Sequence, residues 1–140
     1  MVNSRQKGKR IELEAVKFLK SMGIECRRSQ QYSGAGHDFD IEIPDAPNLK
    51  IEVKGVSGLD LGTKLMDQYC EKAEADAPYE SKAEWFILWK KPRMGWRLTF
   101  INHEVLDLSS PTCRVTLDRP EDIKECIVEA YKYHSGFYDR

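Results

Sequence analysis

Two short segments of alternating apolar and charged residues, separated by a turn, constrain the fold of this chain most strongly. Residues 38–43 read DFDIEI and residues 49–54 read LKIEVK, with the turn formers PDAPN between them. Successive side chains of a strand point to opposite faces, so each segment would present one apolar face and one charged face. We therefore predict an antiparallel hairpin centred on Ala46, with Asp40 a close neighbour of Glu52 across the pair.

The charged face of this hairpin would gather acidic groups beside one ammonium group. Glu52 and Lys54 share that face of the second strand, while Asp38, Asp40 and Glu42 share it on the first strand. Opposed like charges destabilise a strand pair, so their pairing asks for a cation. Two carboxylates can hold a divalent cation, and a lysine can polarise a water or a phosphate oxygen. A solvated strand face gives the same alternation, and the residues leave open whether Asp38 or Asp40 is the main metal ligand.

A helix is predicted over residues 6–22, because its apolar residues fall within an arc of about 160°. Glu12 falls inside this arc, where an ionised carboxylate needs a partner. A metal ion with its bound waters is one such partner, and a salt bridge to Arg10 or to another cation is the alternative. Gly23 suits the end of the helix.

The charge of the chain is unevenly distributed. Its 140 residues suit one domain with one core, and the net charge is −1. Residues 1–31 nevertheless carry eight Lys or Arg and only three Glu. A basic end on an acidic body fits a localised phosphate-binding surface, although a solvated terminus gives the same pattern.

Cysteine usage and hydropathy indicate a cytoplasmic protein. The four cysteines, Cys26, Cys70, Cys113 and Cys126, contain no Cys-x-x-Cys pair and are expected to be reduced thiols. No apolar run approaches the ~20 residues that span a bilayer, so no membrane partner is expected. The N-terminus lacks the apolar core of a secretion signal.

The remaining pattern predicts an alternation of strands and helices. Expected are strands near 24–28, 85–89, 96–101 and 114–117, a helix over 63–75, a short helix over 102–106 and a last helix over 120–134. A polar, glycine-containing loop over 30–37 precedes the Asp38 strand. The last helix either caps the core or joins two protomers, and the residues do not decide between these roles.

In order and spacing, these features resemble the PD-(D/E)xK nuclease superfamily, and within it the small Holliday junction resolvases of archaeal and phage type. The matching residues are Gly8 four positions before Glu12, then Glu14, Arg28-Ser29, Ser33-Gly34, Asp40-Ile41 and the strand Ile51-Glu52-Val53-Lys54. The likeness spans roughly residues 5–107, and the segment after Ser109 has no counterpart in it.

The resemblance implies an α/β fold, a restriction-endonuclease-like core with a mixed central β-sheet flanked by helices. It implies one nuclease domain over 1–140, with a core over about 5–107 and a C-terminal extension that carries a helix over about 120–135. The implied catalytic set is Glu12, Asp40, Glu52, Lys54 and Gln68. The implied metal ligands are Asp40, Glu52, the Val53 carbonyl and Glu12, with Asp38 as the other aspartate. The implied DNA contacts are Arg5, Lys7, Lys9, Arg10, Arg27, Arg28 and Ser33.

The expected activity is metal-dependent hydrolysis of phosphodiesters in four-way DNA junctions. The expected cofactor is Mg²⁺, with Mn²⁺ able to substitute, and the expected partners are branched DNA and a second copy of the chain. A nicking or restriction-like nuclease on duplex or flap DNA is the first alternative. A DNA-binding module of the same fold that does not cut is the second.

Overall fold

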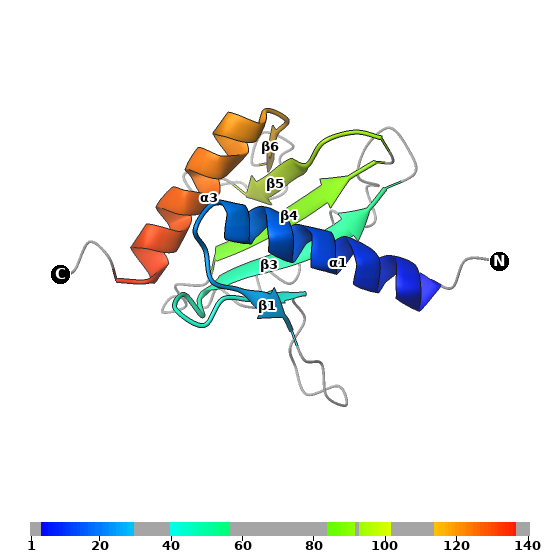
Figure 1. Ribbon diagram of the computed structural model, residues 1–140. Helices are drawn as coiled ribbons and strands as arrows, with labels where there is room; N and C mark the ends of the chain where they lie inside the picture. The colour runs from blue at the N-terminus through cyan, green and yellow to red at the C-terminus, as the bar shows by residue number, and fades with distance from the viewer. Residues whose placement is uncertain (1–3, 30–39, 57–83, 92, 102–113, 137–140) are drawn as a thin grey trace.

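A six-stranded sheet with two helices on one face forms the centre of the protein (Figure 1). The computed structural model describes residues 4–29, 40–56, 84–91, 93–101 and 114–136. The helices are α1 (Ser4–Ser21) and α3 (Pro120–His134). The strands are β1 (Arg27–Arg28), β2 (Ile41–Glu42), β3 (Leu49–Gly55), β4 (Glu84–Lys90), β5 (Arg97–Ile101) and β6 (Arg114–Leu117).

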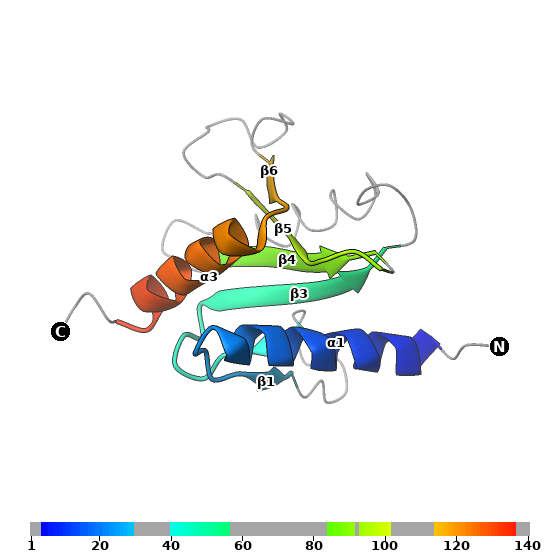
Figure 2. The same ribbon diagram turned by 45° about the horizontal axis from the view of Figure 1, so that its top comes forward.

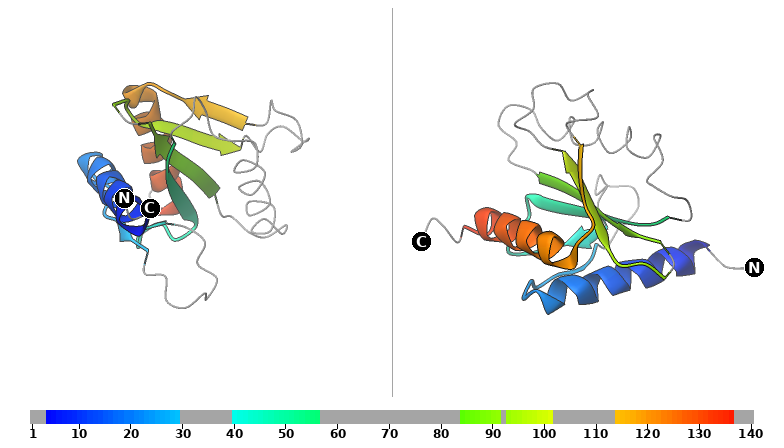
Figure 3. Two further views of the ribbon diagram at one scale, coloured as in Figure 1. Left: turned by 90° about the vertical axis from the view of Figure 1, so that its right-hand side faces the viewer. Right: turned by 90° about the horizontal axis from the view of Figure 1, so that it is seen from above.

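The sheet is mixed, and its strands follow one another in chain order from β1 to β6. β3 and β4 are parallel, whereas every other neighbouring pair is antiparallel. Two turned views show α1 and α3 side by side on the same face (Figures 2 and 3). The predicted α/β class, with a mixed sheet flanked by helices, is confirmed. The two helices expected over 63–75 and 102–106 lie outside the described residues.

α1 ends where its sequence predicts, within one residue. The amide of Gly23 donates to the carbonyl of Lys20 at 2.9 Å, and the amide of Ile24 donates to the carbonyl of Leu19 at 3.2 Å. Gly23 has φ +87°, a left-handed conformation that glycine adopts without a Cβ penalty. These two hydrogen bonds are the Schellman pattern, which satisfies the last carbonyls of the helix and turns the chain into β1.

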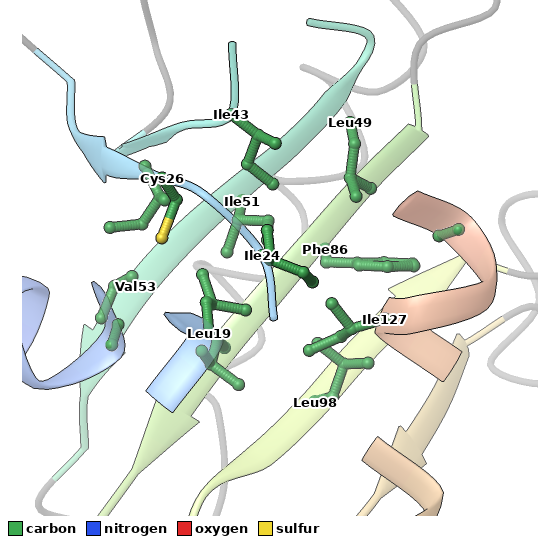
Figure 4. Packing of buried hydrophobic residues seen from close by; sticks show 14 of the residues in the cluster. Leu19, Ile24, Cys26, Ile43, Leu49, Ile51, Val53, Phe86, Leu98 and Ile127 are labelled. Carbon is green, nitrogen blue, oxygen red and sulfur yellow. The ribbon is translucent and has the colours of Figure 1, made fainter. Parts of the chain in front are cut away.

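The hydrophobic core fills the space between the sheet and the two helices (Figure 4). It includes Ala15 and Leu19 of α1, Ile41 of β2, Ile51 and Val53 of β3, Phe86 and Leu88 of β4, Leu98 of β5, and Ile123 and Ile127 of α3. Phe86 also meets Phe100 of β5 edge to face, with ring centroids 5.6 Å apart. The last helix therefore caps the core, one of the two roles that its sequence leaves open.

The hairpin of β2 and β3 has the register that its turn predicts. Ile41 pairs with Ile51, so the pairing is symmetric about Ala46. Ala46 is fully buried, and it closes the turn because its amide donates to the Ile43 carbonyl and its own carbonyl accepts from the Leu49 amide, both at 3.0 Å. The strand expected over 24–28 is shorter than predicted, since only its last two residues pair with β2.

Cys26 shows how burial acts on a thiol in this fold. The side chain lies in the core, and burial raises its pKa to about 11. It therefore stays a neutral thiol at physiological pH. Cys26 and Cys126 are both free, whereas Cys70 and Cys113 lie outside the described residues.

Within the described ranges, neither helix is long and apolar enough to cross a bilayer.

Candidate active site

The acidic residues of the hairpin lie on the sheet face opposite the two helices. Ile51 and Val53 point into the core under α1, so Glu52 and Lys54 point to the other face of β3. Glu52 is only 5% exposed and pairs in register with Ile87 of β4. A carboxylate buried this deeply is costly unless other groups stabilise its charge. The alternation of β3 thus separates a face packed on the helices from a second face, where Glu52 and Lys54 lie beside the buried Ile87 and Trp89 of β4.

Asp40 is held in place by three hydrogen bonds at the start of β2. Its carbonyl accepts from the amide of Ser29 at 2.8 Å, and its amide donates to the carbonyl of Ile51 at 3.1 Å. Its Oδ2 accepts from the amide of Val53 at 2.8 Å. The Asp40 carboxylate therefore accepts a hydrogen bond from the β3 backbone at Val53, the residue that follows Glu52.

This contact predicts how two substitutions of Asp40 differ in stability. Asp40→Ala leaves the buried amide of Val53 without its acceptor, which should lower the free energy of unfolding by about 1–3 kcal/mol. Asp40→Asn keeps a side-chain oxygen for the same bond and should cost less than about 1 kcal/mol. Urea unfolding followed by tryptophan fluorescence, in EDTA, measures both. Equal losses for the two variants would show that the hydrogen bond does not contribute.

Glu12 is ion-paired with Arg28 in the structure. The Arg28 Nε donates to Glu12 Oε2 at 2.9 Å, joining α1 to β1. Arg28 stands opposite Ile41, whose side chain lies in the core, so this pair is on the helix-covered side of the sheet edge. The salt bridge that the sequence offered as an alternative to a metal for Glu12 is therefore present, with Arg28 as the cation. A role for Glu12 in metal binding stays a prediction.

The predicted DNA contacts divide between two surfaces. Lys9 and Arg10 are exposed on α1, where they line a shallow groove with Leu13, Glu14 and Lys17. Arg27 of β1 is ion-paired with Glu42 at 2.6 Å. Arg5 and Lys7 belong to α1, but their side chains lie outside the described part. Asp38, Ser33 and Gln68 also lie outside the described residues.

In comparison with known proteins, no protein-family profile and no curated protein sequence matches the chain. Among solved structures, the comparison finds Hjc of Archaeoglobus fulgidus, described as a Holliday junction resolvase from an archaeal hyperthermophile. This chain is similar to Hjc. The two share 21% sequence identity with a TM-score of 0.47, over 89% of this chain and 99% of Hjc.

The carboxylates of Asp40 and Glu52 are the type of donor that suits a hard divalent cation. Asp40 and Glu52 supply carboxylate oxygens, and Mg²⁺ is commonly bound through one or two carboxylates, several waters and the phosphates of a substrate. Across the described ranges, no group of three or more His, Cys, Asp or Glu side chains forms a metal cluster. Asp40 and Glu52 fit a cation that takes its remaining ligands from waters and from a substrate phosphate.

Sequence reasoning missed a polar network on the same face. The Nε1 of Trp89 donates to Thr99 Oγ1 at 3.0 Å, and Thr99 Oγ1 is 2.8 Å from Thr116 Oγ1. Arg97 lies over the Trp89 ring, with its Cζ 5.4 Å from the ring centroid. Alternation within each strand indicates which of its side chains share a face. Only the pairing of β4 with β5, and of β5 with β6, brings Trp89, Thr99 and Thr116 together.

Proposed function

We propose that this chain is an endonuclease that hydrolyses phosphodiesters at four-way DNA junctions with the help of Mg²⁺. The observation that supports it best is the register of the β2–β3 hairpin. Ile41 pairs with Ile51, which brings Asp40 to the part of β3 that carries Glu52, and Asp40 Oδ2 accepts from the Val53 amide at 2.8 Å. Lys54 follows two residues after Glu52 on the same strand. Two carboxylates and one ammonium group on a shared face are the groups that such hydrolysis uses.

Asp40 and Glu52 are the residues that would hold the metal, with Glu12 and the Val53 carbonyl as further candidate ligands. The hydrogen bond from Val53 to Asp40 supports this role, because it restricts the carboxylate to one orientation. When bound, Mg²⁺ or Mn²⁺ supplies a water of lowered pKa and a positive charge beside the phosphate.

Lys54 would act on the phosphate and on the attacking water. Its ammonium group is a compact charge with three donors, which suits contact with a non-bridging phosphate oxygen or with the oxygen that attacks. A charge in that position stabilises the extra negative charge of the transition state. The half-buried position of Lys54 strengthens this effect, because the effective dielectric near protein is lower than in bulk water.

Basic residues outside the hairpin would hold the DNA backbone. Lys9 and Arg10, exposed on α1, are able to contact phosphates without reading bases. Resolution of a four-way junction requires paired cuts, so we propose that two copies of the chain assemble with their active sites related by two-fold symmetry. Lys9 and Arg10 lie on the helix side of the sheet, so they would serve a second arm of branched DNA.

A cleavage assay tests the proposal directly. Equal concentrations of a synthetic four-way junction, a flap and a linear duplex are incubated with the protein in Mg²⁺, with EDTA as control. We expect paired cuts in the junction, slower cutting of the other two DNAs and none in EDTA. Equal cutting of all three DNAs would replace the junction proposal with a nuclease of broader substrate range. Binding without any cutting would leave a non-catalytic DNA-binding module.

A further inference from the structure

A row of three residues crosses the sheet beside the candidate active site. Lys54 of β3 pairs with Trp89 of β4, and Trp89 pairs with Arg97 of β5. Paired residues of neighbouring strands point to the same face, and Glu52 shares that face with Lys54. Arg97 is therefore on the carboxylate side of the sheet, two strands away from the proposed catalytic lysine.

Trp89 gives Arg97 a rigid support. Its ring is fully buried, and its Nε1 is bonded to Thr99, which in turn contacts Thr116. The guanidinium carbon of Arg97 lies 5.4 Å from the ring centroid, within the range of a cation–π interaction. Such a contact restricts the long arginine side chain before any ligand arrives, which lowers the entropy that binding costs.

The chemistry of the guanidinium group suits a phosphate. It stays charged at any physiological pH and carries five N–H donors in a planar fork that matches phosphate oxygens. Contact with an aromatic face leaves the in-plane donors of the fork available. Arg27, on the same face, is ion-paired with Glu42, whereas no carboxylate among the described residues forms an ion pair with Arg97.

The spacing suits a nucleic-acid strand. Neighbouring strands lie about 4.8 Å apart, so two spacings separate the backbones of Lys54 and Arg97 by about 10 Å. This distance is close to the rise of three nucleotides at about 3.4 Å each along a DNA strand. A strand whose scissile phosphate lies at Lys54 would therefore carry a flanking phosphate toward Arg97.

We propose that Arg97, supported by the ring of Trp89, is a positioning residue that binds a backbone phosphate flanking the scissile one. This inference rests on the proposed function, since it takes Lys54 and Glu52 as the cleavage site. The contact holds the cut strand in register with the carboxylates and is independent of base sequence.

Three variants test the proposal: Arg97→Ala, Arg97→Lys and the matched control Arg119→Ala, which removes an exposed arginine of the same charge at the start of α3. Single-turnover cleavage of the junction should fall about 100-fold in Arg97→Ala, because a misplaced strand loses near-attack geometry. The slope of log Kd against log salt, measured by anisotropy in EDTA, should decrease by about one. Arg97→Lys should keep the slope but lose cleavage, since it retains the charge without the planar fork.

Replacing single DNA phosphates with an uncharged methylphosphonate identifies the phosphate that Arg97 would contact. Junctions with a single methylphosphonate at each position near the cut are titrated with wild-type protein and with Arg97→Ala. At one flanking position, the modification should weaken wild-type binding several-fold and leave Arg97→Ala unaffected. Equal losses for both proteins at every position, or an Arg97→Ala variant that behaves like Arg119→Ala, would overturn the proposal. Thermal midpoints matching that of the wild type show that the variants are folded.

The two proposals fail in different ways. If the wild-type protein binds junctions without cutting them, the endonuclease proposal fails, while the salt slope and the methylphosphonate titration still decide the role of Arg97. If the wild-type protein cuts junctions and Arg97→Ala cuts them equally well, only the Arg97 proposal fails.

Discussion

Replacing Glu52 with glutamine should lower the rate of the proposed Mg²⁺-dependent cleavage by about 100- to 1000-fold, since loss of the proposed metal ligand would remove several kcal/mol of transition-state stabilisation. Glutamine has nearly the same shape, so the buried position beside Ile87 remains filled. The substitution removes the charge that would hold the cation. Single-turnover cleavage of a labelled four-way junction measures the effect, and junction binding in EDTA should change by less than about threefold.

Glu42→Gln is the matched control for this result. Glu42 lies on the same hairpin but pairs with Arg27 in an exposed ion pair. Exposed pairs contribute about 0–1 kcal/mol, so this variant should cut within about threefold of the wild type. A Glu52→Gln protein that cleaves as fast as Glu42→Gln would remove Glu52 from the metal site and leave the proposed chemistry without its centre.

Replacing Phe86 with alanine should lower the free energy of unfolding by about 3–5 kcal/mol, through lost burial and the cavity that remains. Phe86 is 1% exposed at the centre of the core, between α3 and β5, and its ring contacts Phe100. Domains are typically stable by about 5–15 kcal/mol, so this one change removes a large fraction of the total. Urea unfolding followed by circular dichroism measures the loss.

Two further variants calibrate the stability measurement. Phe86→Leu keeps most of the buried volume and should cost clearly less than the alanine variant. Leu13→Ala changes a side chain that is 45% exposed on α1 and should change stability by less than about 0.5 kcal/mol. A loss below about 1 kcal/mol for Phe86→Ala would mean that the core relaxes to fill the cavity or does not depend on this ring.

The hairpin that carries Glu52 could be predicted because it depends on residues close together in the chain. The turn over residues 44–48 sets the pairing of the strands beside it, and Ile41 pairs with Ile51 in the register that this turn predicts. The partner of Glu12 could not be derived in this way. Arg28 lies sixteen residues further along, and only the packing of α1 against β1 brings it to that carboxylate.

The sequence by itself determined the hairpin, the end of α1 at Gly23 and the bounds of α3, because periodicity, turn residues and caps act over a few neighbouring positions. The tertiary structure alone decided that α3 completes the core and that β3 pairs in parallel with β4. It alone placed Arg97 on Trp89 in line with Lys54. These contacts join segments separated by long stretches of chain, and their geometry follows from how the whole sheet packs rather than from any local pattern.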